Sequence, residues 1–299
     1  MSGRYVAGVS RSSIPNPCME SEHVLADRSD PQAILDIVRE KRIDVVVDLL
    51  AYTESATRPL LASLEGRIGR FVLVSSCDVY RDYGLLHRRE AGLPQLGDID
   101  EKAPLRASRY PYRASTPRPT NDPTQWMDNY DKIPIEEATK LLRSDWTILR
   151  LPMVFGPGDR QRRFRWAIEP MLAGVDTIEV PPQWADWLTT YGYVENVGAA
   201  IALASGHERA SRSTFNVGDS ESVNHREWIK RFCRATGWQG TVRDTDSSEH
   251  PIAKAIERLD MSVPLRISSA KLFQELSFKP PVDVHASAKL TVADETKRR

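Results

Sequence analysis

Short runs of β-branched and other apolar residues alternate with helix-like patterns through the first half of this chain, and the alternation limits the folds that it can adopt. Continuous apolar runs are typical of parallel strands buried on both faces. The intervening patterns indicate helices, as where Asp30 stands as an N-cap before Pro31 and an apolar stripe follows. This order predicts an α/β fold with a doubly wound parallel sheet. The expected strands are Tyr5–Val9, His23–Ala26, Ile43–Leu50, Phe71–Val74 and Trp146–Leu149.

The composition is that of a globular protein without a strong overall charge. With 299 residues, 40% of them hydrophobic, the chain can bury a sizeable core, and its length suggests about two domains. The 41 basic residues balance the 41 acidic ones, so neither nucleic acid nor an anionic membrane is an expected partner. No apolar stretch approaches the ~20 residues of a spanning helix. Residues Met1–Arg4 also lack the basic-then-apolar order of a signal peptide.

The cysteines and histidines indicate neither a disulfide framework nor a metal site. Cys18, Cys77 and Cys233 are odd in number and widely spaced, and none of them belongs to a CxxC pair. The six histidines show no HxH or HExxH spacing. We therefore expect no metal and a reducing, cytoplasmic location.

The pattern changes twice along the chain. The segment 82–129 is rich in proline and arginine and has no apolar stripe, so it is either an active-site loop or lid, or disordered. After Gly156 the pattern becomes mixed, with a helix capped by Asn224 and closed by Gly237, which predicts a smaller second domain. The expected first domain comprises 1–155 and the returning segment 183–217, and the expected second domain comprises 156–182 and 218–299.

Three motifs, in a fixed order, carry a resemblance to a known family. In Phe71–Tyr80 (FVLVSSCDVY) an apolar strand leads into a hydroxyl pair, with Ser76 four residues before Tyr80. Leu149–Gly158 (LRLPMVFGPG) and Gly192–Val197 (GYVENV) follow. With these motifs most of the chain resembles the extended short-chain dehydrogenase/reductase family, which includes nucleotide-sugar epimerases and dehydratases. The resemblance implies a Rossmann-like domain, a smaller substrate domain, and NAD or NADP as the cofactor.

The resemblance also implies catalytic roles for three side chains. Ser76 would hydrogen-bond the reacting oxygen of the substrate, and Tyr130 would transfer the proton. Lys132 would tune Tyr130 or hold the ribose of the cofactor. The nicotinamide would carry the hydride.

The spacing of the tyrosine and the lysine departs from the family, in which the two lie four residues apart on one helix face. Here Pro134 occupies the fourth position, and Lys132, two residues after Tyr130, would lie about 200° away around a regular helix. Proline is tolerated in the first turn of a helix but not in its interior. We therefore predict that the helix begins nearby, with Asp131 as the N-cap and Tyr130 before it. The alternative is a semi-buried tyrosine and a solvated first-turn lysine.

The family pattern suggests several residues that would hold the cofactor. Asp27 would accept a hydrogen bond from the adenine amino group, and Arg11 would grip the 2′-phosphate of NADP. The alternatives are a helix-capping aspartate and a lone surface arginine. The other positions, which packing could explain equally well, are Arg28, the turn formed by Leu50, Ala51 and Tyr52, and the pair Pro152 and Met153 at the nicotinamide amide.

One feature of the family has no counterpart in this sequence. The family begins with a strand and a GxGxxG-type turn, whose glycines let the backbone approach the pyrophosphate at a helix N-terminus. Nothing here matches that turn, and the strand at Tyr5–Val9 aligns with the second strand of the family. Three explanations stay open: the sequence starts downstream of the true start, the sheet closes up over the gap, or another chain donates a strand.

Two further features have two interpretations each. The run Asp159–Arg165 holds four arginines and is either a clamp for a phosphate or carboxylate, or a solvated face. Trp184 and Trp187 either line a substrate cleft or pack between domains.

The expected function is an NAD(P)-linked epimerase/dehydratase or oxidoreductase that acts on a small molecule, either a sugar nucleotide or a small alcohol or ketone. A homodimer through the helices after Thr53 and Pro134 is expected by analogy with the family. The alternative, motivated by the absent glycine turn, is a degenerate member that does not use a dinucleotide: a cofactor-free isomerase or cyclase, or a binding protein. RNA binding, as in some plastid relatives of the fold, is disfavoured by the balanced charge.

Overall fold

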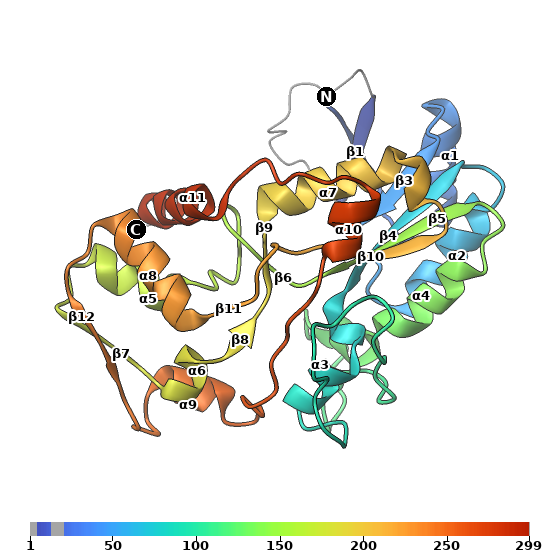
Figure 1. Cartoon of the computed structure of the whole chain (residues 1–299). Helices are drawn as coiled ribbons and strands as arrows, with labels where there is room; N and C mark the ends of the chain where they lie inside the picture. The colour runs from blue at the N-terminus through green and yellow to red at the C-terminus, as the bar shows by residue number, and fades with distance from the viewer. Residues whose placement is uncertain (1–4, 13–20, 299) are drawn as a thin grey trace. The chain divides into compact units, whose positions relative to one another are not determined.

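The computed structural model describes residues 5–12 and 21–298. The chain forms two compact units, one of Met1–Leu73 with Tyr112–Trp146 and one of Val74–Pro111 with Thr147–Arg299. Figure 1 labels the helices and strands of both units. The strands are β1 Val6–Ser10, β2 Ser21–Leu25, β3 Val45–Asp48, β4 Arg70–Ser76, β5 Asp145–Leu151, β6 Met153–Phe155, β7 Thr177–Val180, β8 Leu188–Thr189, β9 Tyr191–Tyr193, β10 Ser213–Asn216, β11 Val223–Asn224 and β12 Thr241–Asp244.

The helices follow the strands in the alternating order that the sequence predicts, which confirms the α/β class. The α-helices are α1 Pro31–Glu40, α2 Glu54–Leu64, α3 Arg81–Leu86, α4 Lys132–Lys140, α5 Arg165–Leu172, α6 Pro182–Ala185, α7 Val194–Gly206, α8 His225–Thr236, α9 Pro251–Ile256, α10 Ala270–Glu275 and α11 Val284–Lys297. The 3-10 helices are η1 Cys77–Val79, η2 Gln125–Asn129 and η3 Glu208–Ala210.

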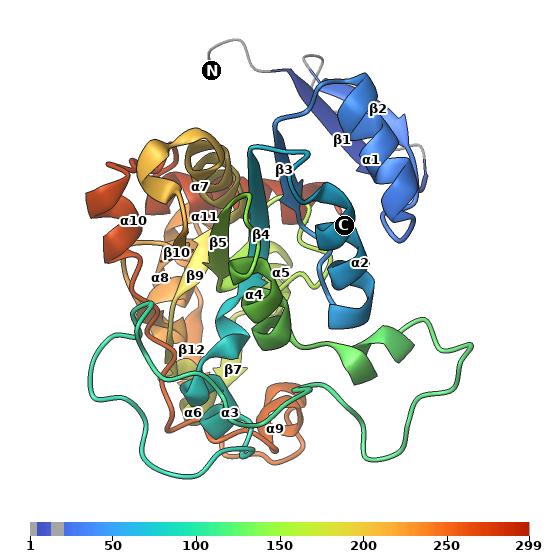
Figure 2. The same ribbon diagram turned by 90° about the vertical axis from the view of Figure 1, so that its right-hand side faces the viewer.

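The first unit holds two separate parallel strand pairs. β1 pairs with β2 from Val6 opposite Ser21 onward, and β3 pairs with the first half of β4 from Val45 opposite Arg70 onward. Figure 2 shows β1 and β2 side by side, apart from β3. Among the described residues β1 forms no ladder with β3. These two strands therefore do not pair directly in place of the first strand of the family, which was one of the three explanations left open by the sequence.

Helix α1 of the first unit begins as its sequence predicts. The Asp30 carboxylate accepts hydrogen bonds from the backbone N–H groups of Gln32 and Ala33, at 3.0 and 3.1 Å. Pro31 occupies the first helical position, where its missing N–H leaves no hydrogen bond unmade. The stripe of Ile34, Leu35 and Val38 is buried, and α1 lies against α2. Capping and an apolar stripe therefore define this helix, as expected.

A four-stranded parallel sheet has the order β10-β5-β4-β3. β4 and β5 each contribute residues to both units. In the second unit β10 pairs with β5, with Ser213 opposite Thr147. The central residues of β4, Phe71, Val72 and Leu73, are fully buried, as is typical of a strand covered on both faces.

The second unit has its own aromatic core, built around Phe155, Phe164, Trp228 and Phe232. Helix α8 carries two of these rings one turn apart and is capped by Asn224, whose Oδ1 accepts from the Glu227 N–H at 3.1 Å. It ends at Gly237, which has a left-handed φ of 72°. Both caps confirm the sequence prediction for this helix. Small sheets pair β6 with β9, β7 with β12 and β8 with β11.

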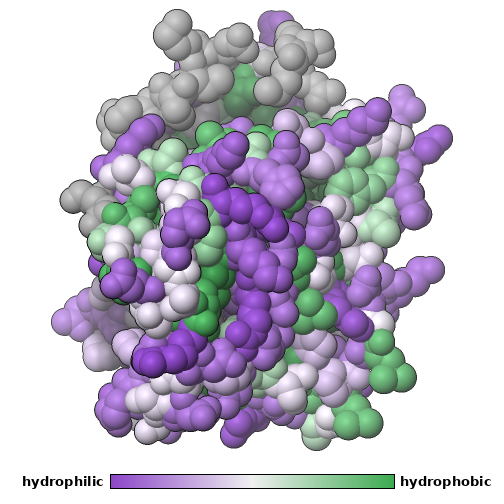
Figure 3. Space-filling view, turned by 60° about the vertical axis from the view of Figure 1, so that its left-hand side comes forward, coloured by the Kyte–Doolittle hydropathy of each residue, from purple (hydrophilic) through white to green (hydrophobic). Residues whose placement is uncertain are grey.

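The proline-rich segment 82–129 is largely irregular, with α3 overlapping its start and η2 near its end. Within the described residues no helix has both the length and the apolarity that crossing a bilayer requires. Figure 3 shows one face of the molecule, on which hydrophilic residues predominate and hydrophobic ones lie between them. Residues Met1–Arg4 and Cys18, which entered the sequence expectations, lie outside the described residues.

Candidate functional site

The start of α4 has the local structure that the tyrosine–lysine spacing predicts. The helix begins at Lys132, and the Asp131 carboxylate caps it by accepting from the Ile133 N–H at 3.1 Å. Pro134 lies in the first turn, where backbone N–H groups have no partner within the helix. Tyr130 therefore precedes the helix, in extended backbone. The prediction for this segment is confirmed.

Lys132 reaches Tyr130 although the two residues are only two positions apart. Its Nζ donates to the Ala51 carbonyl at 2.7 Å and lies 5.2 Å from the centre of the Tyr52 ring and 5.8 Å from the centre of the Tyr130 ring. A cation within about 6 Å of an aromatic face is attracted by its π-electrons. Only 3% of Lys132 is exposed, so the ammonium is buried at the junction between the end of β3 and the start of α4.

The backbone also joins these two segments. Tyr130 forms an antiparallel bridge with Thr53, and the Asp131 N–H donates to the Tyr52 carbonyl at 3.3 Å. Thr53 in turn caps α2 by accepting from the Ala56 N–H. The turn after β3 and the residue before α4 are therefore held together by main-chain and side-chain contacts.

An aromatic cluster surrounds Tyr130. The rings of Tyr52 and Trp126 are stacked with centres 4.7 Å apart, and Tyr112 lies 5.0 Å from Tyr130. Trp126 is 40% exposed and Tyr52 is 37% exposed, whereas Tyr130 is only 6% exposed. Reasoning from the sequence missed Trp126 because it lies in the irregular proline-rich segment. The position of Trp126 four residues before Tyr130 was the one local signal.

The residues expected to hold the adenosine lie at the carboxyl ends of β1 and β2. Arg11 directly follows β1, Asp27 follows β2, and both are exposed. The Asp27 carboxylate accepts from the N–H and the hydroxyl of Ser29, at 2.8 and 2.7 Å. These hydrogen bonds, with a smaller contribution from Arg11, hold the pKa of Asp27 below its usual value. Asp27 is therefore an ionised acceptor that faces solvent.

Arg28 is engaged by the protein itself. Its Nε donates to both carboxylate oxygens of Asp48, at 2.8 and 3.0 Å, and its Nη2 contacts Asp48 and donates to Thr57 Oγ1 at 3.1 Å. Asp48 also accepts from the Leu50 N–H at 2.9 Å. A bidentate pair of this kind fixes geometry as well as charge. Arg28 thus positions the turn after β3, a role that its sequence neighbours did not indicate.

The residues of the turn Leu50, Ala51 and Tyr52 differ in their exposure and in their hydrogen bonds. Leu50 is 50% exposed, Ala51 is fully buried, and the Tyr52 N–H closes the turn by donating to the Leu50 carbonyl at 2.8 Å. The Ala51 carbonyl is the acceptor for Lys132. The turn thus combines one exposed apolar side chain with a buried anchor for the lysine.

Ser76 ends β4 in the second unit, whereas Tyr130 and Lys132 belong to the first. The Ser76 hydroxyl caps η1 by accepting from the Asp78 N–H at 3.1 Å. Ser76 is half-buried, and its neighbours Ser75 and Cys77 are buried. The position at the carboxyl end of a central parallel strand is where ligands bind in open α/β sheets.

Tyr80, the tyrosine that ends the motif Phe71–Tyr80, is buried and hydrogen-bonded within the protein. Its hydroxyl donates to Asn216 Oδ1 at 2.6 Å and accepts from Arg150 Nη1 at 3.0 Å. Burial raises the pKa of Tyr80 far above its usual value. The backbone N–H of Asn216 also donates a hydrogen bond to the Glu101 carboxylate, to Oε1 at 2.7 Å. This buried network joins β5, β10 and the η1 segment, and Tyr80 is kept as a neutral phenol.

The remaining cofactor positions, Pro152 and Met153, are both half-buried. Pro152 directly precedes β6, and Met153 is the first residue of β6 and pairs with Tyr191 of β9. Pro152 lies close to a glycine backbone, since a Cβ added at Gly218 would meet its Cγ at 3.2 Å. A larger residue at Gly218 would therefore displace Pro152 or Thr190.

Three of the four arginines in the run after β6 form ion pairs within the chain. Arg162 pairs with Glu295 of α11, and Arg163 pairs with Asp159 at 2.7 Å. Arg165 pairs with Glu169 one turn along α5. These contacts favour the interpretation of the run as part of the protein surface.

Trp184 packs in the second unit against a buried histidine. Its ring stacks on His225 with centres 4.0 Å apart, and Trp187 lies 5.8 Å from Trp184. His225 also contacts the Tyr191 hydroxyl at 2.9 Å, and burial lowers its pKa to about 4. The two tryptophans therefore serve packing within this unit.

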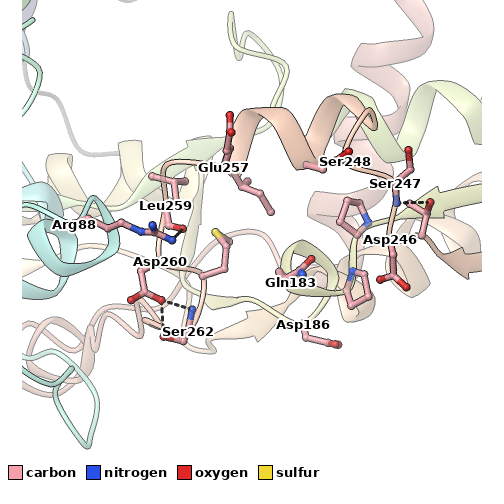
Figure 4. Close-up of a pocket in the computed structure, with 16 residues that line it drawn as sticks. Arg88, Gln183, Asp186, Asp246, Ser247, Ser248, Glu257, Leu259, Asp260 and Ser262 are labelled. Atoms are coloured by element: carbon pink, nitrogen blue, oxygen red, sulfur yellow. Dashed lines mark hydrogen bonds between the residues drawn. The ribbon is translucent and has the colours of Figure 1, made fainter.

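The second unit contains a cavity of about 830 Å³, shown in Figure 4. Its walls come from the start of α6, the loop after β12, and α9 with the segment that follows it. Arg88, just after α3, closes the side opposite Asp246 and Ser247. Because α3 follows η1, only a short stretch of chain separates this wall from Ser76.

Comparison with known proteins bears on the fold. No protein-family model matches the chain. The chloroplast stem-loop binding protein of 41 kDa b from Arabidopsis thaliana is 22% identical over 216 residues, which cover 72% of this chain and 49% of that protein. The chain thus spans about half the length of this curated relative.

Solved structures of epimerases match nearly the whole chain. A putative epimerase from Burkholderia cenocepacia has a TM-score of 0.68 at 21% identity, over 99% of this chain and 91% of the other. The UDP-glucose 4-epimerase from Thermotoga maritima has a TM-score of 0.67 at 16% identity, over 99% and 92%. The UDP-glucuronic acid 4-epimerase from Bacillus cereus, solved with UDP-glucuronic acid and NAD, has a TM-score of 0.65 at 15% identity, over 99% and 92%.

These likenesses define the class of the protein: it is an α/β protein with the Rossmann-like fold found in NAD-dependent sugar-nucleotide epimerases. The resemblance to the extended short-chain dehydrogenase/reductases, drawn from three sequence motifs, is confirmed at the level of the fold.

Proposed function

We propose that this chain is an NAD(P)-linked enzyme of the epimerase/dehydratase or oxidoreductase type, acting on a small hydroxyl- or carbonyl-bearing substrate. Tyr130 transfers the proton, Lys132 supports it, and Ser76 hydrogen-bonds the reacting oxygen. The domain division into 1–155 with 183–217, and 156–182 with 218–299, belongs to this proposal. So do a homodimer through α2 and α4 and a cytoplasmic location.

The observation that carries the proposal is the convergence on Lys132 in the first unit. One buried ammonium binds the Ala51 carbonyl at 2.7 Å and lies within 5.8 Å of the Tyr130 ring. A nearby positive charge favours the deprotonated form of a phenol, which is the form that accepts a proton from a substrate hydroxyl.

Some of the residues at the carboxyl ends of β1, β2 and β3 have the chemistry that binding a dinucleotide requires. The ionised, exposed Asp27 suits an adenine amino donor, and the exposed Arg11 suits a phosphate. The turn after β3 offers a half-exposed Leu50 and the Tyr52 ring for apolar contact with the nicotinamide half. When bound, the nicotinamide would accept hydride from a substrate carbon and return it.

The protein's own groups account for the proton. Tyr130 takes the proton of the substrate hydroxyl when the hydrogen on the adjacent substrate carbon leaves as hydride. In the reverse direction Tyr130 returns the proton to the substrate oxygen. Lys132 stabilises the phenolate form that Tyr130 has before it takes this proton. Ser76 donates its hydrogen bond to the same substrate oxygen and so orients it.

The second candidate is a degenerate family member that does not use a dinucleotide. It is favoured by the separation of β1 from β3, because the strands described here form no pyrophosphate cradle between them. The chloroplast relative is named a stem-loop binding protein. Nucleic-acid binding, including RNA binding, is disfavoured here by the balanced charge.

Titration calorimetry of the full chain with NAD and with NADP tests the proposal. We expect binding of one of them, weakened by Asp27→Asn and unchanged by Tyr130→Phe. Turnover with a panel of sugar nucleotides and small alcohols, followed by nicotinamide absorbance for net oxidation or reduction and by NMR of the products for epimerisation, should fall about 10²- to 10⁴-fold in Tyr130→Phe.

Tyr83→Phe is the matched control, because it removes a phenol from α3 in the second unit. It should retain the parental turnover. If neither dinucleotide binds and the chain nevertheless converts a substrate, the cofactor-free alternative replaces this proposal.

A further inference from the structure

A single carboxylate closes the proline-rich loop 112–129 of the first unit. Asp128 lies in η2 near the end of this loop and is only 9% exposed. Its Oδ1 accepts from the Ala114 N–H at 3.2 Å, and its Oδ2 accepts from the Arg118 N–H at 2.8 Å. The Arg118 guanidinium also forms an ion pair with this carboxylate. Because residues 112–124 contain neither helix nor strand, these side-chain contacts fix the course of the loop.

The contacts of Asp128 depend on both of its carboxylate oxygens. The Arg118 N–H makes the largest contribution to lowering the pKa of Asp128 below its usual value, and the Ala114 N–H adds to it, although burial opposes the shift. A carboxylate can accept on both oxygens, whereas an asparagine amide can accept on one and would turn its NH2 toward a backbone N–H. Asparagine at position 128 would therefore lose at least one of the contacts that close the loop.

Two arginines hold the beginning of the loop against its end. Arg118 Nη1 donates to the Tyr112 carbonyl at 3.1 Å, and thereby joins Tyr112 to Asp128. Arg113 Nε donates to the Asp128 carbonyl at 2.8 Å. Because Asp128 lies two residues before Tyr130, and the Tyr112 ring contacts the Tyr130 ring, both ends of the loop lie beside Tyr130.

The closed loop brings two aromatic rings against Tyr130. The centre of the Tyr112 ring lies 5.0 Å from that of the Tyr130 ring, and the centre of the Trp126 ring lies 6.0 Å from it. The Tyr52 ring, from the turn after β3, lies 6.1 Å from Tyr130 and stacks on Trp126. Aromatic rings at such distances prefer a limited set of tilts, which restricts the orientation of the phenol. With this aromatic cluster around it, Tyr130 is left 6% exposed.

We propose that Asp128 is a positioning residue for Tyr130. By closing the loop 112–129 it keeps the aromatic cluster packed on the phenol, which fixes the orientation of the phenol and excludes water from it. Asp128 need not touch the substrate. Orientation of a reacting group supplies part of the rate of an enzyme, and a small displacement of the group loses it. The consequence for catalysis rests on the proposed function, whereas the shielding of Tyr130 does not.

Nitration by tetranitromethane, located by peptide mass spectrometry of the full chain, tests the shielding of Tyr130 without an assay of activity. The reagent modifies phenols that it can reach. In the parent we expect rapid nitration of Tyr52, which is 37% exposed, and slow nitration of Tyr130, which is 6% exposed. Asp128→Asn should raise the initial rate at Tyr130 about tenfold, because hydrogen bonds to a charged group are lost and the loop opens more often.

Asp122→Asn is the matched control, because this carboxylate lies in the same loop but accepts from the N–H and hydroxyl of Thr124, at 2.7 and 2.6 Å, within its own turn. It should leave Tyr130 as slow to react as in the parent. Tyr80 of the second unit is 1% exposed and should stay unmodified in both variants, which reports that the fold is intact.

Tyr112→Leu tests the same proposal with the loop still closed, since Arg118 binds the backbone carbonyl at position 112 and not the ring. It should also speed nitration of Tyr130, and it decides the test alone where Asp128→Asn exposes Tyr80. In the turnover assay both variants should lower kcat about 10- to 100-fold and leave KM within about twofold of the parent, since orientation is lost and substrate binding is not.

Three results of the nitration experiment would overturn the proposal. These are modification of Tyr130 in the parent as fast as that of Tyr52, unchanged protection of Tyr130 in the folded variants Asp128→Asn and Tyr112→Leu, and an equal effect of Asp122→Asn. Parental kcat in both loop variants would overturn the positioning role. Absence of turnover in the parent would count against the proposed function alone, because nitration does not depend on it.

Discussion

Replacing Lys132 with methionine removes one buried ammonium and keeps the length and apolar character of the side chain. The change abolishes the hydrogen bond from Nζ to the Ala51 carbonyl and the cation contacts with the Tyr52 and Tyr130 rings. The surrounding backbone contacts, such as the hydrogen bond from Asp131 to Tyr52, do not depend on the ammonium.

Opposing terms keep the predicted change in stability small. A hydrogen bond from a charged group contributes about 1.5 to 3 kcal/mol, and a desolvated cation–π contact contributes about 2 kcal/mol. Against this, burying an ammonium costs several kcal/mol of desolvation, which the methionine avoids. We expect the free energy of unfolding of Lys132→Met to lie within about 2 kcal/mol of the parent.

Turnover should respond much more strongly than stability. If Lys132 supports proton transfer by Tyr130, its loss should lower kcat by about 10²- to 10⁴-fold with little change in KM. Urea unfolding at pH 7 measures stability, and nicotinamide absorbance together with NMR of the products measures kcat and KM. Lys289→Met, an exposed lysine of α11, serves as the control and should change neither quantity.

Two results would refute this reasoning. A Lys132→Met protein that turns over at the parental rate would show that the ammonium has no part in the chemistry. A loss of more than about 4 kcal/mol in the free energy of unfolding would show that the residue is chiefly structural, since that loss is typical of breaking a buried ion pair.

Three further predictions concern stability and are checked by urea unfolding. Arg28→Ala should lose about 3 to 5 kcal/mol because it strands the buried Asp48 carboxylate; adding Asp48→Ala should restore part of the loss, and strict additivity would contradict the pairing. Gly237→Ala should cost about 1 kcal/mol at its left-handed φ of 72°, and an unchanged midpoint would argue against that conformation. Burial raises the pKa of Asp219 from 3.8 to about 6, so its proton binds more tightly in the folded state, and its contribution is fully present below pH 4 and lost as pH rises through 6. Asp219→Asn should therefore be more stable than the parent by about 1 to 3 kcal/mol at pH 7, with the difference disappearing near pH 4.

The features that the sequence predicted correctly depend on interactions over a few residues. Asp30 and Pro31 start α1, Asn224 starts α8, and Gly237 ends it, because a cap is a hydrogen bond or a backbone angle within one turn. The start of α4 after Tyr130 followed in the same way, from the restrictions that proline places on a helix. The α/β class followed from the order of strands and helices.

The features that only the tertiary structure decided join residues that are far apart in the chain. Lys132 meets the Ala51 carbonyl across 81 residues, Arg28 meets Asp48 across 20, and Tyr80 meets Asn216 across 136. No local pattern distinguishes a lysine that turns inward from one that faces solvent. That choice depends on which strand end returns to the same place, and hence on how the whole chain packs.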